Sequence, residues 1–127
     1  MGEEAVLVLV VDDDIALADM IQSMLKHYGY RVRTTSDSRE ALELARSLMP
    51  DLILCDTIMP GQTGGEVVFS LKADAATAHI PVILMTGGAR TFEEIACAGF
   101  LGKPFTPTEL KAAVENVLRV RVKTGGP

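Results

Sequence analysis

Length, composition and charge restrict what this chain can be. It has 127 residues, enough for one domain with a real core, and a formal net charge of -5 with a pI of about 4.9. An acidic surface repels phosphate backbones, so no direct nucleic-acid partner is expected, and two cysteines cannot form a disulfide framework. No apolar run approaches the ~20 residues that span a bilayer, and the acidic start Met1-Gly2-Glu3-Glu4 does not resemble a signal peptide. We therefore expect a soluble, cytoplasmic protein with two reduced thiols and no membrane contact.

The first two strands and the helix between them follow from the hydrophobic pattern. Residues 6–11 form a short apolar run, typical of a strand buried on both faces, and the run ends at Asp12-Asp13-Asp14. Apolar residues then recur at helical spacing from Leu17 to Tyr28, and Asp14 is the nearest candidate N-cap. Residues 31–35 predict a second strand, and their single apolar residue between two arginines is the profile of a sheet edge.

The middle of the chain predicts a buried strand between two helices. Asp37 and Glu40 fit a variant of the capping box at the start of a helix that reaches Leu48. The apolar run 52–55 then leads directly into Asp56, and Pro60-Gly61 ends it. A third helix is expected over residues 64–72.

The last third predicts two more strands and two helices. Residues 82–85 form an apolar run that leads into Thr86, and residues 100–102 form a short one that leads into Lys103. Between these strands only about two turns of helix fit before Gly99, so a short fourth helix containing Cys97 is expected. Thr106-Pro107-Thr108-Glu109 combines a capping box with proline at the first helical position, and an apolar stripe follows it to Leu118.

Five strands alternating with five helices predict an α/β fold with a parallel sheet and right-handed crossovers. The most apolar strands, the first, third and fourth, belong in the middle, which gives the doubly wound, flavodoxin-like order 2-1-3-4-5 with a short fourth helix. We expect a single domain over residues 1–127, with a core of about 5–120 and residues 121–127 as a tail or linker.

Four strand ends would bring reactive side chains to one edge of this sheet. Carboxyl ends of parallel strands meet at the edge where open α/β sheets place their ligands. The side chains expected there are those of Asp12, Asp13, Asp56, Thr86 and Lys103. Clustered carboxylates with no histidine or cysteine ligand suit a hard cation such as Mg²⁺, and an aspartate is a competent nucleophile towards phosphorus. Three carboxylates, one ammonium and one divalent ion sum to about zero charge.

With these residues in view, the chain resembles the receiver domains of two-component response regulators, among them the chemotaxis regulators, from about Val6 to Leu118. The motifs that carry the resemblance are the acidic end of the first strand, the segment 51–60, Gly64, the segment 81–86, and Gly99 to Phe105 with its Lys103-Pro104-Phe105. In this family the Lys-Pro bond is commonly cis, so the same is expected of Lys103-Pro104.

The resemblance implies a role for each site residue. Asp56 would be the phospho-acceptor, and Asp12 and Asp13 would hold Mg²⁺ together with Asp56 and the backbone carbonyl of Ile58. Thr86 would be the switch hydroxyl, Lys103 the salt-bridge partner of the phosphoryl group, and Phe100 the switch aromatic coupled to Thr86.

The resemblance also implies partners. The phosphoryl donor would be a phosphohistidine on a sensor histidine kinase or a histidine phosphotransfer protein, and the output a downstream target protein or an attached output domain. Such a domain assists its own phosphotransfer and dephosphorylation but is not a turnover enzyme. The connection from Thr86 to Lys103 is several residues shorter than is common in the family, so the face of helix four, strand five and helix five is curtailed.

Two other functions compete with this interpretation. A small aspartate-nucleophile phosphatase of the haloacid-dehalogenase kind would share the strand-end acids, but its motif after the first strand would end in Thr or Val, where Ala16 stands here. An interaction module that is never phosphorylated is the other alternative, although every reactive position at the strand ends is filled. Hydrolysis of phosphate esters lost in Asp12→Asn but kept in Asp56→Asn would indicate the phosphatase, and partner binding indifferent to Asp56→Asn and to Mg²⁺ would indicate the module.

Overall fold

From β1 to β4 the strands and helices of the described residues alternate along the chain as the hydrophobic pattern predicts. The computed structural model describes residues 5–87 and 97–125, with side chains described as far as Arg119. In chain order the elements are β1 (Leu7–Val11), α1 (Ile15–His27), β2 (Arg31–Thr35), the 3-10 helix η1 (Ser38–Glu40), α2 (Ala41–Leu48), β3 (Leu52–Asp56), α3 (Gly64–Lys72), β4 (Val82–Thr86), β5 (Gly99–Gly102) and α5 (Pro107–Gly125). The predicted fourth helix falls on residues outside those described.

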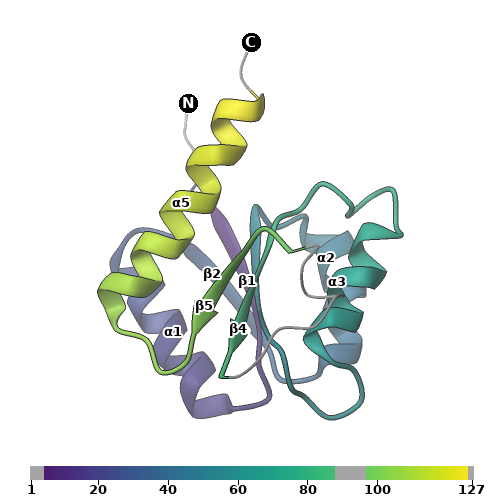
Figure 1. Cartoon of the computed structure of the whole chain (residues 1–127), viewed down its shortest axis with the longest axis horizontal. Helices are drawn as coiled ribbons and strands as arrows, with labels where there is room; N and C mark the ends of the chain where they lie inside the picture. The colour runs from purple at the N-terminus through teal and green to yellow at the C-terminus, as the bar shows by residue number, and fades with distance from the viewer. Residues whose placement is uncertain (1–4, 88–96, 126–127) are drawn as a thin grey trace.

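The five strands form one parallel sheet in the order β2-β1-β3-β4-β5, which confirms the predicted topology. Helices α1 and α5 lie on one face of the sheet and α2 and α3 on the other (Figure 1). Every residue of β3 and β4 is buried, because helices cover both faces, whereas β2 at the edge alternates between exposed and half-buried residues as far as the buried Thr35.

Alternate residues of the central strands supply two separate cores. Val8 and Val10 of β1 point into a cluster with Ile21 and Leu25 of α1, which also includes Leu110 and Val114 of α5. Leu9 and Val11 of the same strand point into the opposite cluster, formed with residues of α2 and α3. The two-residue repeat of a strand therefore divides one apolar run between two helical layers.

Several predicted helix starts are confirmed. The Asp14 carboxylate accepts a hydrogen bond from the Leu17 amide at 3.1 Å and caps α1. Before α5, the Glu109 amide donates to the Thr106 hydroxyl at 3.1 Å and the Thr106 amide to the Glu109 carboxylate at 2.8 Å, which completes the predicted capping box.

Two predictions need correction. Asp37 does cap a helical turn, but it accepts from the Arg39 amide, and the Glu40 carboxylate accepts from the Thr35 hydroxyl instead of closing a capping box. The Thr35 hydroxyl also accepts a hydrogen bond from the Asp37 amide. This second bond holds the hydroxyl beside the turn, where it can donate to the Glu40 carboxylate.

The other correction concerns Cys97, which lies in a bend ahead of β5 rather than in a helix, and whose thiol donates to the Gly99 carbonyl at 3.1 Å. Helix α5 runs on to Gly125. Its last turns extend beyond the sheet (Figure 1).

None of the helices in the described part of the chain is long and apolar enough to cross a membrane.

Candidate functional site

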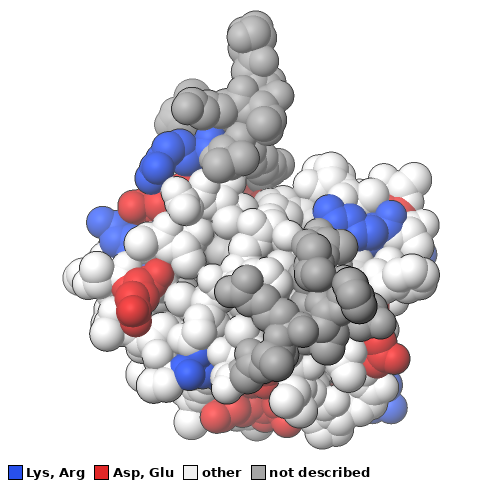
Figure 2. Space-filling view, viewed as in Figure 1, with Lys and Arg blue, Asp and Glu red and all other residues white. Residues whose placement is uncertain are grey.

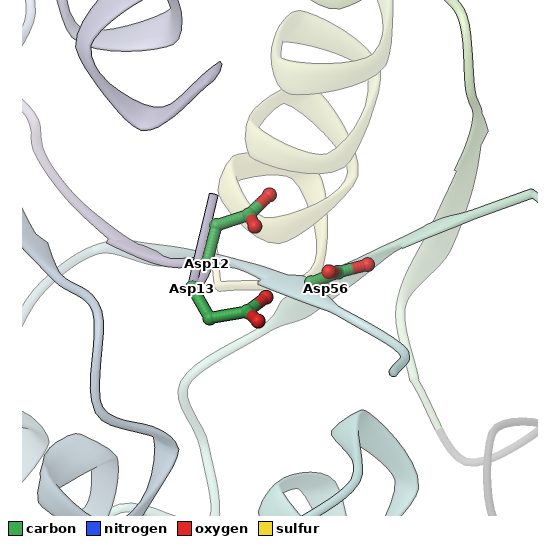
Figure 3. A group of neighbouring side chains, drawn as sticks. All are labelled: Asp12, Asp13 and Asp56. Carbon is green, nitrogen blue, oxygen red and sulfur yellow. The ribbon is translucent and has the colours of Figure 1, made fainter. Parts of the chain in front are cut away.

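Three carboxylates gather at the carboxyl edge of the sheet, as the strand ends predict. Asp12 and Asp13 follow β1, and Asp56 is the last residue of β3, the strand beside it. A carboxylate oxygen from each lies within 4.8 Å of the other two, and Figure 3 shows the side chains of Asp12 and Asp13 extending towards Asp56. Figure 2 shows Asp and Glu side chains at the same edge of the molecule, at the bottom of the view.

Lys103 joins this group from the far end of the sequence. Its ammonium lies 3.1 Å from Oδ1 of Asp56 and 3.3 Å from Oδ2 of Asp12. The Lys103 amide also donates to the Thr86 carbonyl at 2.8 Å, which continues the β4–β5 pairing one residue past the strand. The Lys103-Pro104 peptide is cis, as the resemblance implies.

Backbone amides supply the remaining described hydrogen bonds to the carboxylates. The Thr57 amide donates to Oδ1 of Asp56 at 2.9 Å, and the Asp14 amide donates to Oδ1 of Asp12 at 2.9 Å. Asp12 is fully buried and Asp56 nearly so, whereas Asp13 is exposed. One solvent-accessible acid and two buried ones therefore line the site.

The electrostatics of the site leave it short of positive charge. Burial raises the pKa of the Asp12 carboxyl, and the Asp56 charge adds to this, against the opposing effects of the Asp14 amide and the Lys103 ammonium. For Lys103, burial would lower the pKa, but the hydrogen bond to Asp56 and the charge of Asp12 outweigh it, so its pKa is raised. Three carboxylates share one ammonium, and a divalent cation would balance them.

The thiol beside the site is inert in this arrangement. Cys55 is fully buried in β3, and burial, with the charges of Asp56 and Asp12, raises the pKa of its thiol far above the ordinary value. Cys55 and Cys97 are both free cysteines, as predicted.

The predicted switch residues, Thr86 and Phe100, lie on β4 and β5. Thr86 is buried at the end of β4, one residue beyond the Asp56–Met85 pair of the sheet. Phe100 of β5 is half-buried and packs against the core cluster on the α2–α3 side. The Ile58 side chain is 81% exposed beside the acids, so this large apolar group meets solvent at the rim of the site.

Gly64 supports Asp56 in a way that the sequence did not indicate. A Cβ at this position would collide with the Asp56 carbonyl oxygen and would lie 2.9 Å from both Leu84 Cδ2 and Thr57 Cα. The Gly64 amide donates to the Thr57 carbonyl at 2.9 Å. Helix α3 can therefore begin directly against the end of β3 only because residue 64 has no side chain.

The predicted start of the third helix at residue 64 is confirmed, and a capping box holds it. Thr63 and Glu66 form a complete capping box, with hydrogen bonds of 3.1 Å and 2.8 Å. The pattern is the same Thr-x-x-Glu that predicts the start of α5, and it is a second sequence signal for this boundary.

Comparison with known proteins gives a consistent result. The family model of the response regulator receiver domain matches residues 8–115. The DNA-binding response regulator MtrA of Mycolicibacterium paratuberculosis is 36% identical over 117 residues, which cover 88% of this chain and 51% of MtrA. The chain thus spans about half the length of this curated relative.

Two solved structures are similar throughout. The chemotaxis response regulator CheY4 of Vibrio cholerae is 32% identical with a TM-score of 0.84, and the match covers 90% of this chain and 99% of CheY4. The receiver domain of the sensor histidine kinase PA1611 from Pseudomonas aeruginosa, which has a magnesium ion coordinated in its active-site cleft, is 25% identical with a TM-score of 0.83, and the match covers 91% of this chain and 99% of that domain.

Proposed function

Because this chain belongs to the response regulator receiver domain family, we propose that Asp56 accepts a phosphoryl group from a phosphohistidine on a sensor histidine kinase or a histidine phosphotransfer protein. The observation that supports this most directly is the position of Lys103, whose ammonium lies within 3.3 Å of both Asp12 and Asp56. A cation held between two buried acids is placed to meet a third anionic group.

Asp56 has one fixed oxygen and one available oxygen. The Thr57 amide and the Lys103 ammonium both contact Oδ1. Within the described residues Oδ2 has no hydrogen bond, so its lone pairs are open for attack. In the proposed step Oδ2 attacks phosphorus, a P–O bond forms and the P–N bond to the donor imidazole breaks. The bonding electron pair leaves with the imidazole nitrogen, and the product is an aspartyl phosphate.

Other side chains of the site would stabilise the transferred group. The Lys103 ammonium would move from Asp56 to a phosphoryl oxygen, and the Thr86 hydroxyl would donate to another. Thr86 ends β4, the strand next to β3, and the Lys103 ammonium already lies 3.1 Å from Asp56, so neither needs a large backbone movement to reach the group.

The carboxylates of Asp12, Asp13 and Asp56 and the backbone carbonyl of Ile58 would hold Mg²⁺. Clustered oxygen donors and the raised pKa of Asp12 support this choice, because a hard divalent cation relieves the repulsion among the acids. When bound, the metal neutralises charge on the phosphoryl oxygens.

Signal output would depend on Thr86 and Phe100. Once Thr86 turns towards the phosphoryl group, Phe100 could occupy the space it leaves, which would change the face formed by β5, α5 and the segment before β5. The partner would be a downstream target protein or an attached output domain, with no direct nucleic acid or membrane contact of this domain. We infer a cytoplasmic location and a phospho-acceptor that assists its own dephosphorylation without acting as a turnover enzyme.

Incubation with acetyl phosphate and Mg²⁺, followed by intact-mass measurement, tests the proposal. The wild-type chain should gain one phosphoryl group, which peptide mapping should locate on Asp56, and chelation of the metal should prevent it. Asp56→Asn should gain none. Asp13→Asn is the matched variant, since it keeps the acceptor but removes an exposed metal ligand, and it should be phosphorylated far more slowly. Modification that persists in Asp56→Asn would rule out the assignment.

A further inference from the structure

The turn between β2 and α2 contacts the loop that follows Asp56. Ser38, the first residue of η1, is 1% exposed, and its hydroxyl donates to the Pro60 carbonyl at 3.2 Å. The two residues are 22 positions apart in the sequence. Pro60 stands two residues after Ile58, so this hydrogen bond holds the β3–α3 loop close to the site.

The same turn is bonded to the other side of the site. The Asp12 amide donates to the Thr35 carbonyl at 3.1 Å at the end of β2. The Thr35 hydroxyl donates to the Glu40 carboxylate at 2.9 Å and accepts from the Asp37 amide at 3.2 Å, which fixes the course of the turn. Hydrogen bonds therefore tie the turn 35–40 to the backbone of Asp12 on one side and to Pro60 on the other.

Arg39 supports the loop from a second direction. Its side chain lies against Gly61, where an added Cβ would be 3.4 Å from Arg39 Cδ. Gly61 has a φ of 88°, a conformation that favours glycine. The guanidinium of Arg39 is in turn held by the Asp37 carboxylate, with hydrogen bonds of 3.0 Å and 3.1 Å.

From these contacts we infer that Ser38 is a positioning residue for the metal site. This inference rests on the proposed function, in which the Ile58 carbonyl is a ligand of Mg²⁺. Mg²⁺ demands near-ideal octahedral geometry, so a backbone carbonyl serves as a ligand only when its loop is held in place. Ser38 holds that loop through Pro60, and the turn 35–40 sets its distance from the acids that follow β1. Ser38 does not itself contact the metal.

The test compares Ser38→Ala with Ser36→Ala by isothermal titration with Mg²⁺ at fixed ionic strength. Ser36 lies in the same turn but is exposed, so it controls for the loss of a hydroxyl. Ser38→Ala should bind Mg²⁺ about three- to tenfold more weakly, below the ~10- to 100-fold cost of losing a partner that contacts a ligand directly. Ser36→Ala should bind within twofold of the wild type. Gly61→Ala should also weaken Mg²⁺ binding, because the added Cβ would press against Arg39 at a residue whose φ favours glycine.

Thermal unfolding without metal and amide NMR separate positioning from stability. A purely structural role for Ser38 would lower the melting temperature but leave the Mg²⁺ affinity of the folded protein unchanged. In the positioning role, the Met59 amide, which shares its peptide with the Ile58 carbonyl, shifts with Mg²⁺ in the wild type and needs more metal to shift in Ser38→Ala.

Two outcomes would overturn the inference, and they are distinguishable. Equal Mg²⁺ affinity in Ser38→Ala and the wild type, with Mg²⁺-dependent phosphorylation of Asp56 intact, would remove the role of Ser38 alone. A wild-type chain that binds no Mg²⁺ would remove the metal site and the role of Ser38 together.

Discussion

Two places in this molecule hold aspartates next to a cation, with opposite consequences for the carboxyl groups. Where α2 ends, Arg46 pairs with Asp74, and the Asp74 carboxylate accepts from Arg46 Nε at 2.7 Å and from the Ala76 amide at 2.9 Å. These two donors lower the pKa of Asp74, the backbone hydrogen bond most strongly. At the opposite edge of the sheet, burial and the charge of Asp56 raise the pKa of Asp12 although Lys103 lies beside it.

The difference lies in the balance of charge and donors around each acid. Asp74 faces one arginine and a free backbone amide at the surface, so its ionised form is favoured. Asp12 is buried with two further acids around a single ammonium, so its ionised form is disfavoured. The charges of Arg46 and Asp74 therefore stabilise the fold. The charges around Asp12 destabilise it until a cation binds. Groups held against the stability of the fold are typical of functional sites.

The largest effect is expected from Asp12→Asn. Loss of a proposed Mg²⁺-binding carboxylate should weaken Mg²⁺ binding by at least about 100-fold. The same change should stabilise the metal-free protein by on the order of 1 kcal/mol, because it removes a buried like charge and keeps the acceptor for the Asp14 amide. Titration calorimetry and urea unfolding without metal measure the two effects. Asp74→Asn is the control and should leave Mg²⁺ affinity unchanged; a less stable metal-free Asp12→Asn would contradict the comparison.

Lys103→Met should have the next largest effect, in the opposite direction. It leaves Asp12 and Asp56 without their cation, so the metal-free protein should lose about 1–3 kcal/mol of unfolding free energy at neutral pH. Added Mg²⁺ should restore much of the loss. Lys111→Met offers a matched control, because Lys111 makes an exposed pair with Glu115 at 3.7 Å and should cost less than about 1 kcal/mol. Equal losses in the two variants would show that the acid cluster is not short of positive charge.

The pH dependence of metal-free stability should separate the two places further. Since the folded-state pKa of Asp12 is raised, the native state binds the proton more tightly than the unfolded state, and stability is lost as pH rises through that pKa. The advantage of Asp12→Asn over the wild type should therefore shrink as pH falls towards about 4, the unfolded value. Urea unfolding of both proteins between neutral and acidic pH measures this. An advantage that grows on acidification would mean that the pKa of Asp12 is lowered instead.

Arg46→Ala should have the smallest effect and the opposite pH dependence. Asp74 has a lowered pKa in the folded state, so the stability that its pair contributes is present above the unfolded pKa and is lost as pH falls through the folded pKa. The variant and the wild type should therefore differ slightly at neutral pH and converge in acid, with no change in Mg²⁺ affinity. Surface ion pairs contribute little because water already solvates both partners. A weakened Mg²⁺ affinity would show that this pair is coupled to the site.

Local pattern predicted the regular elements well because their causes are local. Apolar runs identified four of the five strands, and the arginines on either side of Val32 placed β2 at the sheet edge where the structure has it. Capping signals predicted the starts of α1 and α5, since an N-cap bond joins residues only two or three apart. The pattern did not predict that the Thr35 hydroxyl would take the Glu40 carboxylate, because that contact depends on how β2 enters the turn.

The sequence by itself determined the sheet order and which side chains stand at the strand ends, because right-handed crossovers and buried apolar runs allow few arrangements. Only the tertiary structure decided how these side chains share charge: Lys103 reaches Asp12 across 91 positions, and the bare backbone of Gly64 lets α3 begin against Asp56. Such contacts depend on distances between backbones that meet only in the folded chain. The composition of the site and its formal charge could therefore be predicted, whereas the pairing of Lys103 with Asp12 and the anchoring of the loop after Asp56 could not.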